Sequence, residues 1–290
     1  MKKIQHHFVS ETYLRNFTNK QNKIFVLTDD DKIFDTNPNN IFKENHYNTV
    51  NGSLFIEDSI SEIEGAYNTI LKNKILKSTK LTDEEKTIFS LFVAFIHNRV
   101  RIRHELMEKS LTDLLSWADN FKGDNISSAV PSSGKTINIE NIRERLKDFN
   151  PEFAGSSFRT SFHIADLLCQ MKWRFLVIDS DDVFISSDNP AHLCRPTSEN
   201  KYGPEAFGSR PGFIYKDAEL TIPLTPQVIL LASWINNADL DYLPIPDNWV
   251  CQFNYRTMRS ANWLISNKKE KLEEILKKFP YKKPPISEQF

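Results

Sequence analysis

The segment from Thr82 to Glu108 constrains the fold more than any other stretch, because it has the features of one long helix. Thr82 can accept a hydrogen bond from a free backbone N–H group, and the acids at 83–85 suit the positive end of the helix dipole. Between Ile88 and Ile96 nearly every residue is apolar, so this part of the helix would be covered on all sides. We therefore predict a long buried helix in the middle of the domain.

Two arginines extend the inward face of this helix. At about 100° per residue, Arg99 lies on the apolar stripe and Arg103 lies about 40° away from it. A guanidinium keeps its charge, so a buried one needs carboxylates, carbonyl groups or an anionic ligand. The sequence is compatible with an ion pair to Glu62 or Glu64 of the preceding helix and with a phosphate-binding role, and one acid could also orient an arginine toward a ligand.

The stretch 5–17 places two imidazoles and a guanidinium among aromatic residues. A frayed terminus does not need such residues, so we expect the stretch to be tied down and partly buried. His6 and His7 point in different directions, so only one can serve a given site, and we select His7. Acid-base or phosphate-contacting duty and ordinary structural use are the main alternatives, because no HxxxH or HExxH spacing supports a metal site.

A second polar motif, Ser187-Asp188-Asn189-Pro190, follows a predicted hairpin of strands at 175–178 and 183–186. Pro190 disfavours helix at Asn189, so Asp188 and Asn189 are expected at a strand end, where scaffolds commonly display functional groups. A purely structural Asx turn is the alternative. A restriction-type nuclease would continue with an acid, one residue and a lysine on the next strand, but Glu219-Leu220-Thr221 lacks that lysine.

The rest of the chain alternates between short strands and helices. Further strands are expected at 23–27, 32–35, 41–50, 219–223, 227–232 and 263–265. Further helices are expected at about 57–76, 139–149, 157–171, 250–260 and 267–279, and loops at 121–134 and 197–212. With 21 phenylalanines and 8 glycines, the composition favours long helices. We predict a single α+β domain over residues 1–290, mainly helical, with the long buried central helix and a small antiparallel sheet.

Composition excludes several classes of protein. A chain with 40% hydrophobic residues and a net charge of -1 is neither disordered nor a strongly basic nucleic-acid binder. No apolar run suggests a signal peptide or a transmembrane helix, and three widely spaced cysteines without a CxxC pair fit a reduced cytoplasm. The absence of a GxxxxGK[ST] loop and of a GxSxG elbow counts against the common phosphotransferase and hydrolase sites without excluding them. We predict no cofactor.

Several motifs together resemble the bacterial domain of unknown function 4238 family. In chain order they are Gln5-His6-His7-Phe8-Val9, Tyr13-Leu14-Arg15-Asn16-Phe17, Ser61-Glu62-Ile63-Glu64-Gly65, Phe92 to Arg103, Ser187-Asp188-Asn189-Pro190, Ile222-Pro223-Leu224-Thr225-Pro226 and Asn254 to Ser260. The family often has proline after Val, where this chain has Ser10-Glu11, so the bend into the Tyr13 segment can differ. The resemblance implies an accessory cytoplasmic protein of bacteria and mobile elements, and phage defence for some members. It implies no established reaction.

The hypothesis that we favour from sequence is an antiphage effector that acts on nucleic acid as a metal-independent ribonuclease. An imidazole would act as general base, arginines would stabilise phosphate charge, and an acid or amide would orient them. The predicted catalytic residues are His6, His7, Arg99, Arg103, Asp188 and Asn189. Tyr13, Arg15 and Glu64 would bind or orient substrate. The near-neutral charge counts against this hypothesis, because strand binding usually needs a basic groove.

Two alternatives need no reaction. In the first, the chain is a sensor or binding module whose arginines hold an anionic ligand or phage component, and its aromatic residues form an interface. In the second, the polar residues form a buried structural network, and their loss would chiefly lower stability.

Overall fold

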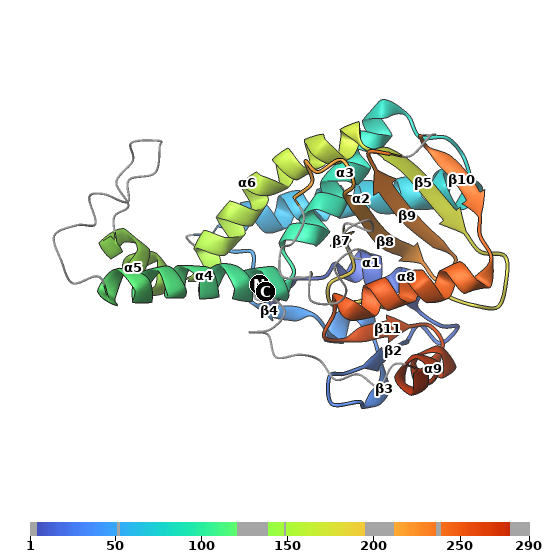
Figure 1. Ribbon diagram of the computed structural model, residues 1–290, viewed down its shortest axis with the longest axis horizontal. Helices are drawn as coiled ribbons and strands as arrows, with labels where there is room; N and C mark the ends of the chain where they lie inside the picture. The colour runs from blue at the N-terminus through green and yellow to red at the C-terminus, as the bar shows by residue number, and fades with distance from the viewer. Residues whose placement is uncertain are drawn as a thin grey trace.

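Of the 290 residues, the computed structural model describes 5–50, 53–120, 139–147, 149–194, 212–235 and 239–278. These ranges contain both helices and strands, so the chain is an α+β protein, as predicted (Figure 1). The loop predicted at 121–134, and all but the last residue of the loop predicted at 197–212, lie outside the described residues. Within the described ranges, no helix is both long and apolar enough to cross a membrane.

The first half of the chain is mainly helical after a short part with strands. Its elements are β1 (Gln5–His7), α1 (Glu11–Leu14), η1 (Arg15–Phe17), β2 (Ile24–Leu27), β3 (Ile33–Thr36), η2 (Pro38–Asn40), β4 (Lys43–Asn45), α2 (Phe55–Asn73), η3 (Ile75–Lys77), α3 (Asp83–Asn98), α4 (Arg101–Asn120), α5 (Ile139–Lys147) and α6 (Phe149–Gln170). The second half contains most of the strands. Its elements are β5 (Lys172–Val177), β6 (Ser186–Ser187), β7 (His192–Cys194), β8 (Glu219–Thr225), β9 (Val228–Ser233), β10 (Asp241–Pro244), α8 (Asp247–Arg259), β11 (Leu264–Ser266) and α9 (Lys269–Lys278).

The strands form three sheets rather than the one small sheet that we predicted. The largest has the order β10-β5-β9-β8-β7, and its β10–β5 pair is parallel while the other pairs are antiparallel. A second sheet, β3-β2-β11-β6, contains the predicted hairpin of β2 and β3. The third pairs β1 with β4.

The hairpin predicted at 175–178 and 183–186 is absent, because β5 and β6 belong to different sheets. A helix side chain takes the place of the partner strand. Asn254 of α8 accepts a hydrogen bond from the backbone N–H of Ile185 at 2.9 Å and donates one to the carbonyl of Val183 at 2.8 Å. These two bonds satisfy backbone groups that a hairpin would otherwise pair.

Helix α3 begins as predicted. Thr82 and Glu85 form a capping box, in which each side chain bonds the backbone N–H of the other residue. Phe89, Phe92 and Val93 are at most 1% exposed. α3 packs against α6 and α2, and Figure 1 shows α6 running alongside it. This helix therefore lies within the main hydrophobic core.

The single long helix that we predicted is instead two helices. α3 ends at Asn98 and α4 begins at Arg101. The hydroxyl of Tyr47 donates to the carbonyl of Arg99 at 2.7 Å, and the N–H of Arg103 bonds the carbonyl of Val100 instead. Because an uninterrupted helix would pair Arg103 N–H with Arg99 C=O, the Tyr47 contact coincides with the break.

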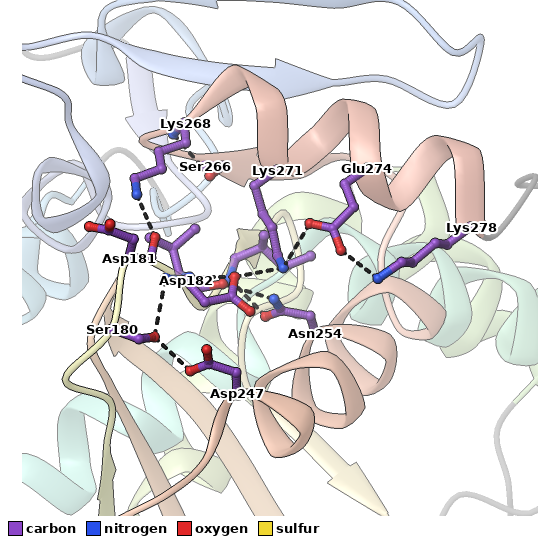
Figure 2. A network of polar contacts seen from close by, with 12 residues as sticks. Ser180, Asp181, Asp182, Asp247, Asn254, Ser266, Lys268, Lys271, Glu274 and Lys278 are labelled. Carbon is purple, nitrogen blue, oxygen red and sulfur yellow. Dashed lines mark hydrogen bonds and ion pairs between the residues drawn. The ribbon is translucent and has the colours of Figure 1, made fainter.

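The C-terminal helix α9 is not simply solvated, since one of its faces is buried. Leu272 is fully buried and Ile275 is 5% exposed. Nζ of Lys271 lies 2.6 Å from Oδ1 of Asp182 and 3.1 Å from Oε2 of Glu274 (Figure 2). This buried ammonium ties α9 to the turn that precedes the Val183 segment.

Candidate functional site

The two adjacent histidines of β1 have different surroundings. His6 is fully buried, and its Nδ1 accepts a hydrogen bond from the backbone N–H of Asn48 at 2.9 Å. His7 retains 13% exposure of its side chain, and its Nε2 lies 3.8 Å from Oε2 of Glu11. Of the two imidazoles, His7 is therefore the one that solvent and a substrate can reach.

Tyr13 is part of the core rather than of a surface. Its fully buried hydroxyl donates to the carbonyl of Pro223 at 2.7 Å and accepts from the hydroxyl of Ser186 at 2.7 Å. Burial raises the pKa of Tyr13 well above its usual value, so the phenol stays neutral. The hydroxyl thereby joins β8 of the five-stranded sheet to β6 of the four-stranded sheet. Arg15 lies on the surface, where it pairs with Glu11.

Arg99 forms the ion pair that the sequence allowed. Its Nη2 lies 2.6 Å from Oε1 of Glu64, and the Arg99 side chain is 5% exposed. Glu62, the other acid considered, is exposed to solvent. The Arg99 charge is therefore balanced within the fold.

Arg103 differs from Arg99 in having no carboxylate partner among the described residues. Its Nη2 lies 2.6 Å from Nε2 of His97, and its buried Nε makes no hydrogen bond. Nδ1 of His97 lies 3.0 Å from the carbonyl oxygen of Ala191. Because a carbonyl oxygen only accepts, Nδ1 carries the proton and Nε2 accepts from Arg103, so His97 is neutral. Burial lowers the pKa of Arg103 to about 10, well above physiological pH, so the guanidinium remains charged.

A cavity of about 300 Å³, wide open to solvent, lies beside Arg103. The end of α3 contributes Asn98, and α4 contributes Arg103 and three further residues. The remainder comes from the N-terminal half of α6. The other lining residues are Leu106, Met107, Ser110, Phe153, Ser156, Ser157 and Thr160. Among the described lining residues none is acidic, and Arg103 is the only one with a charge. This volume is at the lower end of the range for small-molecule sites.

The hydroxyl-bearing residues of α6 follow helical spacing. Ser156 and Thr160 are four positions apart and therefore share a face. Ser157 donates to the carbonyl of Asn98 at 3.4 Å, and the amide of Asn98 donates to the carbonyl of Ser157 at 3.3 Å. These bonds fix α6 against the end of α3, beside Arg103.

Asp188 and Asn189 stabilise a turn. Oδ1 of Asp188 accepts from the backbone N–H of Asn262 at 2.9 Å, and the amide of Asn189 donates to the carbonyl of Ser260 at 2.8 Å. Both bonds go to the connection between α8 and β11. These bonds are long-range contacts and not the local Asx turn that the sequence left open, and they give both side chains partners inside the fold.

The structure gathers only some of the residues that we predicted for one site. His6 and Arg99 both contact the segment at Tyr47 and Asn48, whereas the bonds of Asp188 and Asn189 described above go to the α8–β11 connection. Among the described residues, no group of three or more histidines, cysteines and acids could hold a metal ion. The common role in catalysis that we predicted for the histidines, arginines, Asp188 and Asn189 stays a prediction.

Sequence reasoning missed most of the cavity. At about 100° per residue His97 lies roughly opposite the apolar stripe of α3, yet it is 3% exposed because the segment at Ala191 covers it. The recurrence of small hydroxyl residues at 156, 157 and 160 was the available signal. Nothing in that pattern says which helix faces it.

The fold and the cavity define an α+β protein with one uncompensated arginine at a small, partly apolar pocket. The chain belongs to the family described as "Protein of unknown function (DUF4238)", whose model matches residues 5–270. This confirms the family that the motifs predicted. Comparison with curated proteins and with solved structures gave no match.

Proposed function

We propose that this protein is a binding module for a small anionic ligand, which it holds in the cavity beside Arg103. The observation that carries the proposal is the charge of Arg103, which faces a neutral imidazole and has no carboxylate partner in the described chain. Arg99, one turn earlier, has such a partner in Glu64. The two arginines therefore differ in the way that a structural and a ligand-binding guanidinium would differ.

The energetics support the same function. A buried charge is costly unless a counter-charge and hydrogen bonds compensate it. His97 supplies one acceptor to Arg103 and no negative charge. Nε lacks a partner in Arg99 as well as in Arg103, so the missing counter-charge is what sets Arg103 apart. A bound anion would supply both the missing charge and further acceptors.

A metal-independent ribonuclease is the second candidate, and the pair of His7 and Glu11 is what favours it. A partly exposed imidazole near a carboxylate is an arrangement used in acid-base catalysis. The ribonuclease hypothesis also requires Arg99 and Asn189 to contact the substrate. Both side chains have partners inside the protein, which counts against it. An antiphage role rests on the family resemblance alone. A cytoplasmic location rests on that resemblance and on the cysteine pattern, and both remain proposals.

Thermal denaturation in the presence of a panel of anions tests the binding function. The probes are inorganic phosphate, acetate, phenylacetate, ATP and a short single-stranded RNA, each at millimolar concentration or at saturation. We expect at least one anion to raise the melting temperature of the wild type and of Arg101→Gln, but not of Arg103→Gln. Arg101 is the matched control, because it lies on the same helix with its side chain 58% exposed and paired to Glu44 and Glu105. An equal shift in Arg103→Gln, or no shift with any anion, would exclude this function.

Incubation with total cellular RNA decides the second candidate. The ribonuclease hypothesis expects cleavage by the wild type and by Arg101→Gln, and a strong loss in His7→Ala. Equal cleavage by wild type and His7→Ala, or none by either, removes it.

A further inference from the structure

We infer that the ligand of the Arg103 cavity is a small monocarboxylate with a short apolar tail. The inference rests on the proposed anion-binding function and names the chemical class of the ligand. Three features of the cavity carry it: its single charge, the free N–H groups of its guanidinium, and the division of its wall into a polar and an apolar side.

The charge of the wall selects a monoanion. Arg103 is the only charged residue among the described residues that line the cavity. A carboxylate balances one guanidinium, whereas a phosphate monoester carries up to two negative charges near neutral pH. The second charge would face Leu106, Met107 and Phe153 without a counter-ion, which is unfavourable in a partly buried site.

Several N–H groups of the Arg103 guanidinium have no acceptor among the described residues. Of its five N–H groups, the described residues accept only from Nη2, through His97. A guanidinium matches the two oxygens of a carboxylate with parallel hydrogen bonds. The contact with His97 fixes one end of the Arg103 fork, so the remaining N–H groups are held in place before a ligand arrives.

The α6 side of the cavity supplies neutral donors. Ser156 and Thr160 line it, and their hydroxyls form no hydrogen bond within the described part of the chain. Hydroxyl groups can bond the carboxylate or a polar substituent without adding charge. They therefore strengthen binding of a monoanion and do little to compensate a dianion.

The opposite side sets the size and character of the tail. Leu106, Met107 and Phe153 offer an aliphatic and aromatic surface. The volume of about 300 Å³ is at the lower end of the range for small-molecule sites. This corresponds to phenylacetate or a short fatty acid. A nucleic acid strand would need a basic groove.

Isothermal titration calorimetry with three matched probes tests the inference. Phenylacetate carries the carboxylate and the tail, benzyl alcohol carries the tail alone, and phenyl phosphate replaces the carboxylate with a dianion. We expect phenylacetate to bind the wild type at least about tenfold more tightly than either other probe. Arg103→Gln should weaken phenylacetate about tenfold or more, and Arg101→Gln should leave it unchanged.

Two further variants separate binding from folding. Thr160→Val keeps the shape of the side chain and removes its hydroxyl, so we expect a loss of affinity of a few fold and an unchanged circular dichroism spectrum. Arg103→Lys keeps the charge but cannot donate two parallel hydrogen bonds to a carboxylate. It should therefore recover only part of the affinity that Arg103→Gln loses.

The outcomes distinguish this inference from the function on which it rests. If phenyl phosphate bound more tightly than phenylacetate and Arg103→Gln abolished that binding, the carboxylate class would be wrong and the anion-binding module would stand. Equal binding of phenylacetate and benzyl alcohol would overturn the inference, as would an equal affinity of Arg103→Gln for phenylacetate. Absence of binding by any of the three probes, with a positive response to another anion of the panel, would also overturn it.

Discussion

The hydroxyl of Tyr13 lies 2.7 Å from the carbonyl oxygen of Pro223, although 210 positions separate the two residues. The same hydroxyl contacts Ser186, so one side chain of the N-terminal motif joins two sheets. Tyr13 therefore has a structural role in the fold. Its conformation does not require a substrate.

Replacing Tyr13 by phenylalanine should destabilise the protein by about 1–3 kcal/mol. The change keeps the ring in the core but leaves the Pro223 carbonyl and the Ser186 hydroxyl without their partner, and unsatisfied buried polar groups carry a desolvation penalty of this size. Chemical denaturation measures the difference. Leu14→Val, a neighbouring core change that removes no hydrogen bond, is the control for packing loss. An unchanged free energy of unfolding in Tyr13→Phe would show that the sheet junction does not depend on this hydroxyl.

Arg99→Met should destabilise the fold by about 3 kcal/mol, because it leaves Glu64 partly buried without its counter-ion. The double variant Arg99→Met/Glu64→Leu should recover most of the loss, since removing both partners of a buried pair is often nearly neutral. Arg101→Met, whose side chain is 58% exposed, should change stability by less than about 1 kcal/mol. If the double variant were no more stable than Arg99→Met, the ion pair would not explain the role of Arg99.

Local signals predicted the helices well and the long-range contacts poorly. The start of α3 followed from Thr82 and the acids after it, because a helix cap involves residues only three apart. The break at Arg99 depends on Tyr47, which lies 52 positions earlier, and sequence periodicity carries no trace of that contact. Likewise, the side chain of Asn254 replaces a strand as the hydrogen-bond partner of Val183. For this reason the segment has the sequence pattern of a hairpin but does not form one.

The candidate site was predictable to a similar extent. Helical phase correctly placed Arg99 facing inward, and charge arguments gave its two possible partners. Which arginine lacked a carboxylate was not predictable, because that depends on how α2, α4 and α6 pack. The cavity joins Arg103 to Phe153 and Thr160, and those residues lie some fifty positions away along the chain.

The capping box of α3 should make stability depend on pH in the acidic range. The backbone N–H of Thr82 donates to the Glu85 carboxylate and is the main cause that holds its pKa below the usual value of 4.5. A carboxyl group with a lowered folded-state pKa stabilises the protein fully above its unfolded-state pKa, and the contribution disappears as pH falls through the folded-state value. We therefore expect the stability difference between wild type and Glu85→Gln to be constant above about pH 5.5 and to shrink below 4.5.

Glutamine is the informative substitution, because it can still accept the Thr82 N–H bond but does not titrate. Urea denaturation of both proteins across the acidic range measures the difference. A difference that stayed constant down to pH 3, about one unit or more below the unfolded-state value, would mean that the Glu85 charge contributes nothing to the cap.

Arg103→Met should stabilise the protein in the absence of ligand, the opposite of what Arg99→Met should do. Burial lowers the pKa of Arg103 from 12.5 to about 10. At about 1.4 kcal/mol for each pKa unit, the charged form costs the folded state on the order of 3 kcal/mol. Losing the donor to His97 would offset about 1 kcal/mol of the gain. We expect a net rise in the free energy of unfolding of about 1–2 kcal/mol, which raises the melting temperature by several degrees.

The sign of this change discriminates between the roles of Arg103. A residue kept for the fold destabilises the protein when it is removed, whereas a binding residue held in a costly environment often does the reverse. Thermal and urea denaturation of Arg103→Met beside Arg101→Met give the sign directly, because Arg101 shares the helix but not the cavity. A loss of stability comparable to that of Arg99→Met would mean that the guanidinium supports the fold, and the cavity would lose the observation that makes it a binding site. A gain in Arg103→Met alone, together with loss of the phenylacetate response, would assign the cost of this buried charge to ligand binding.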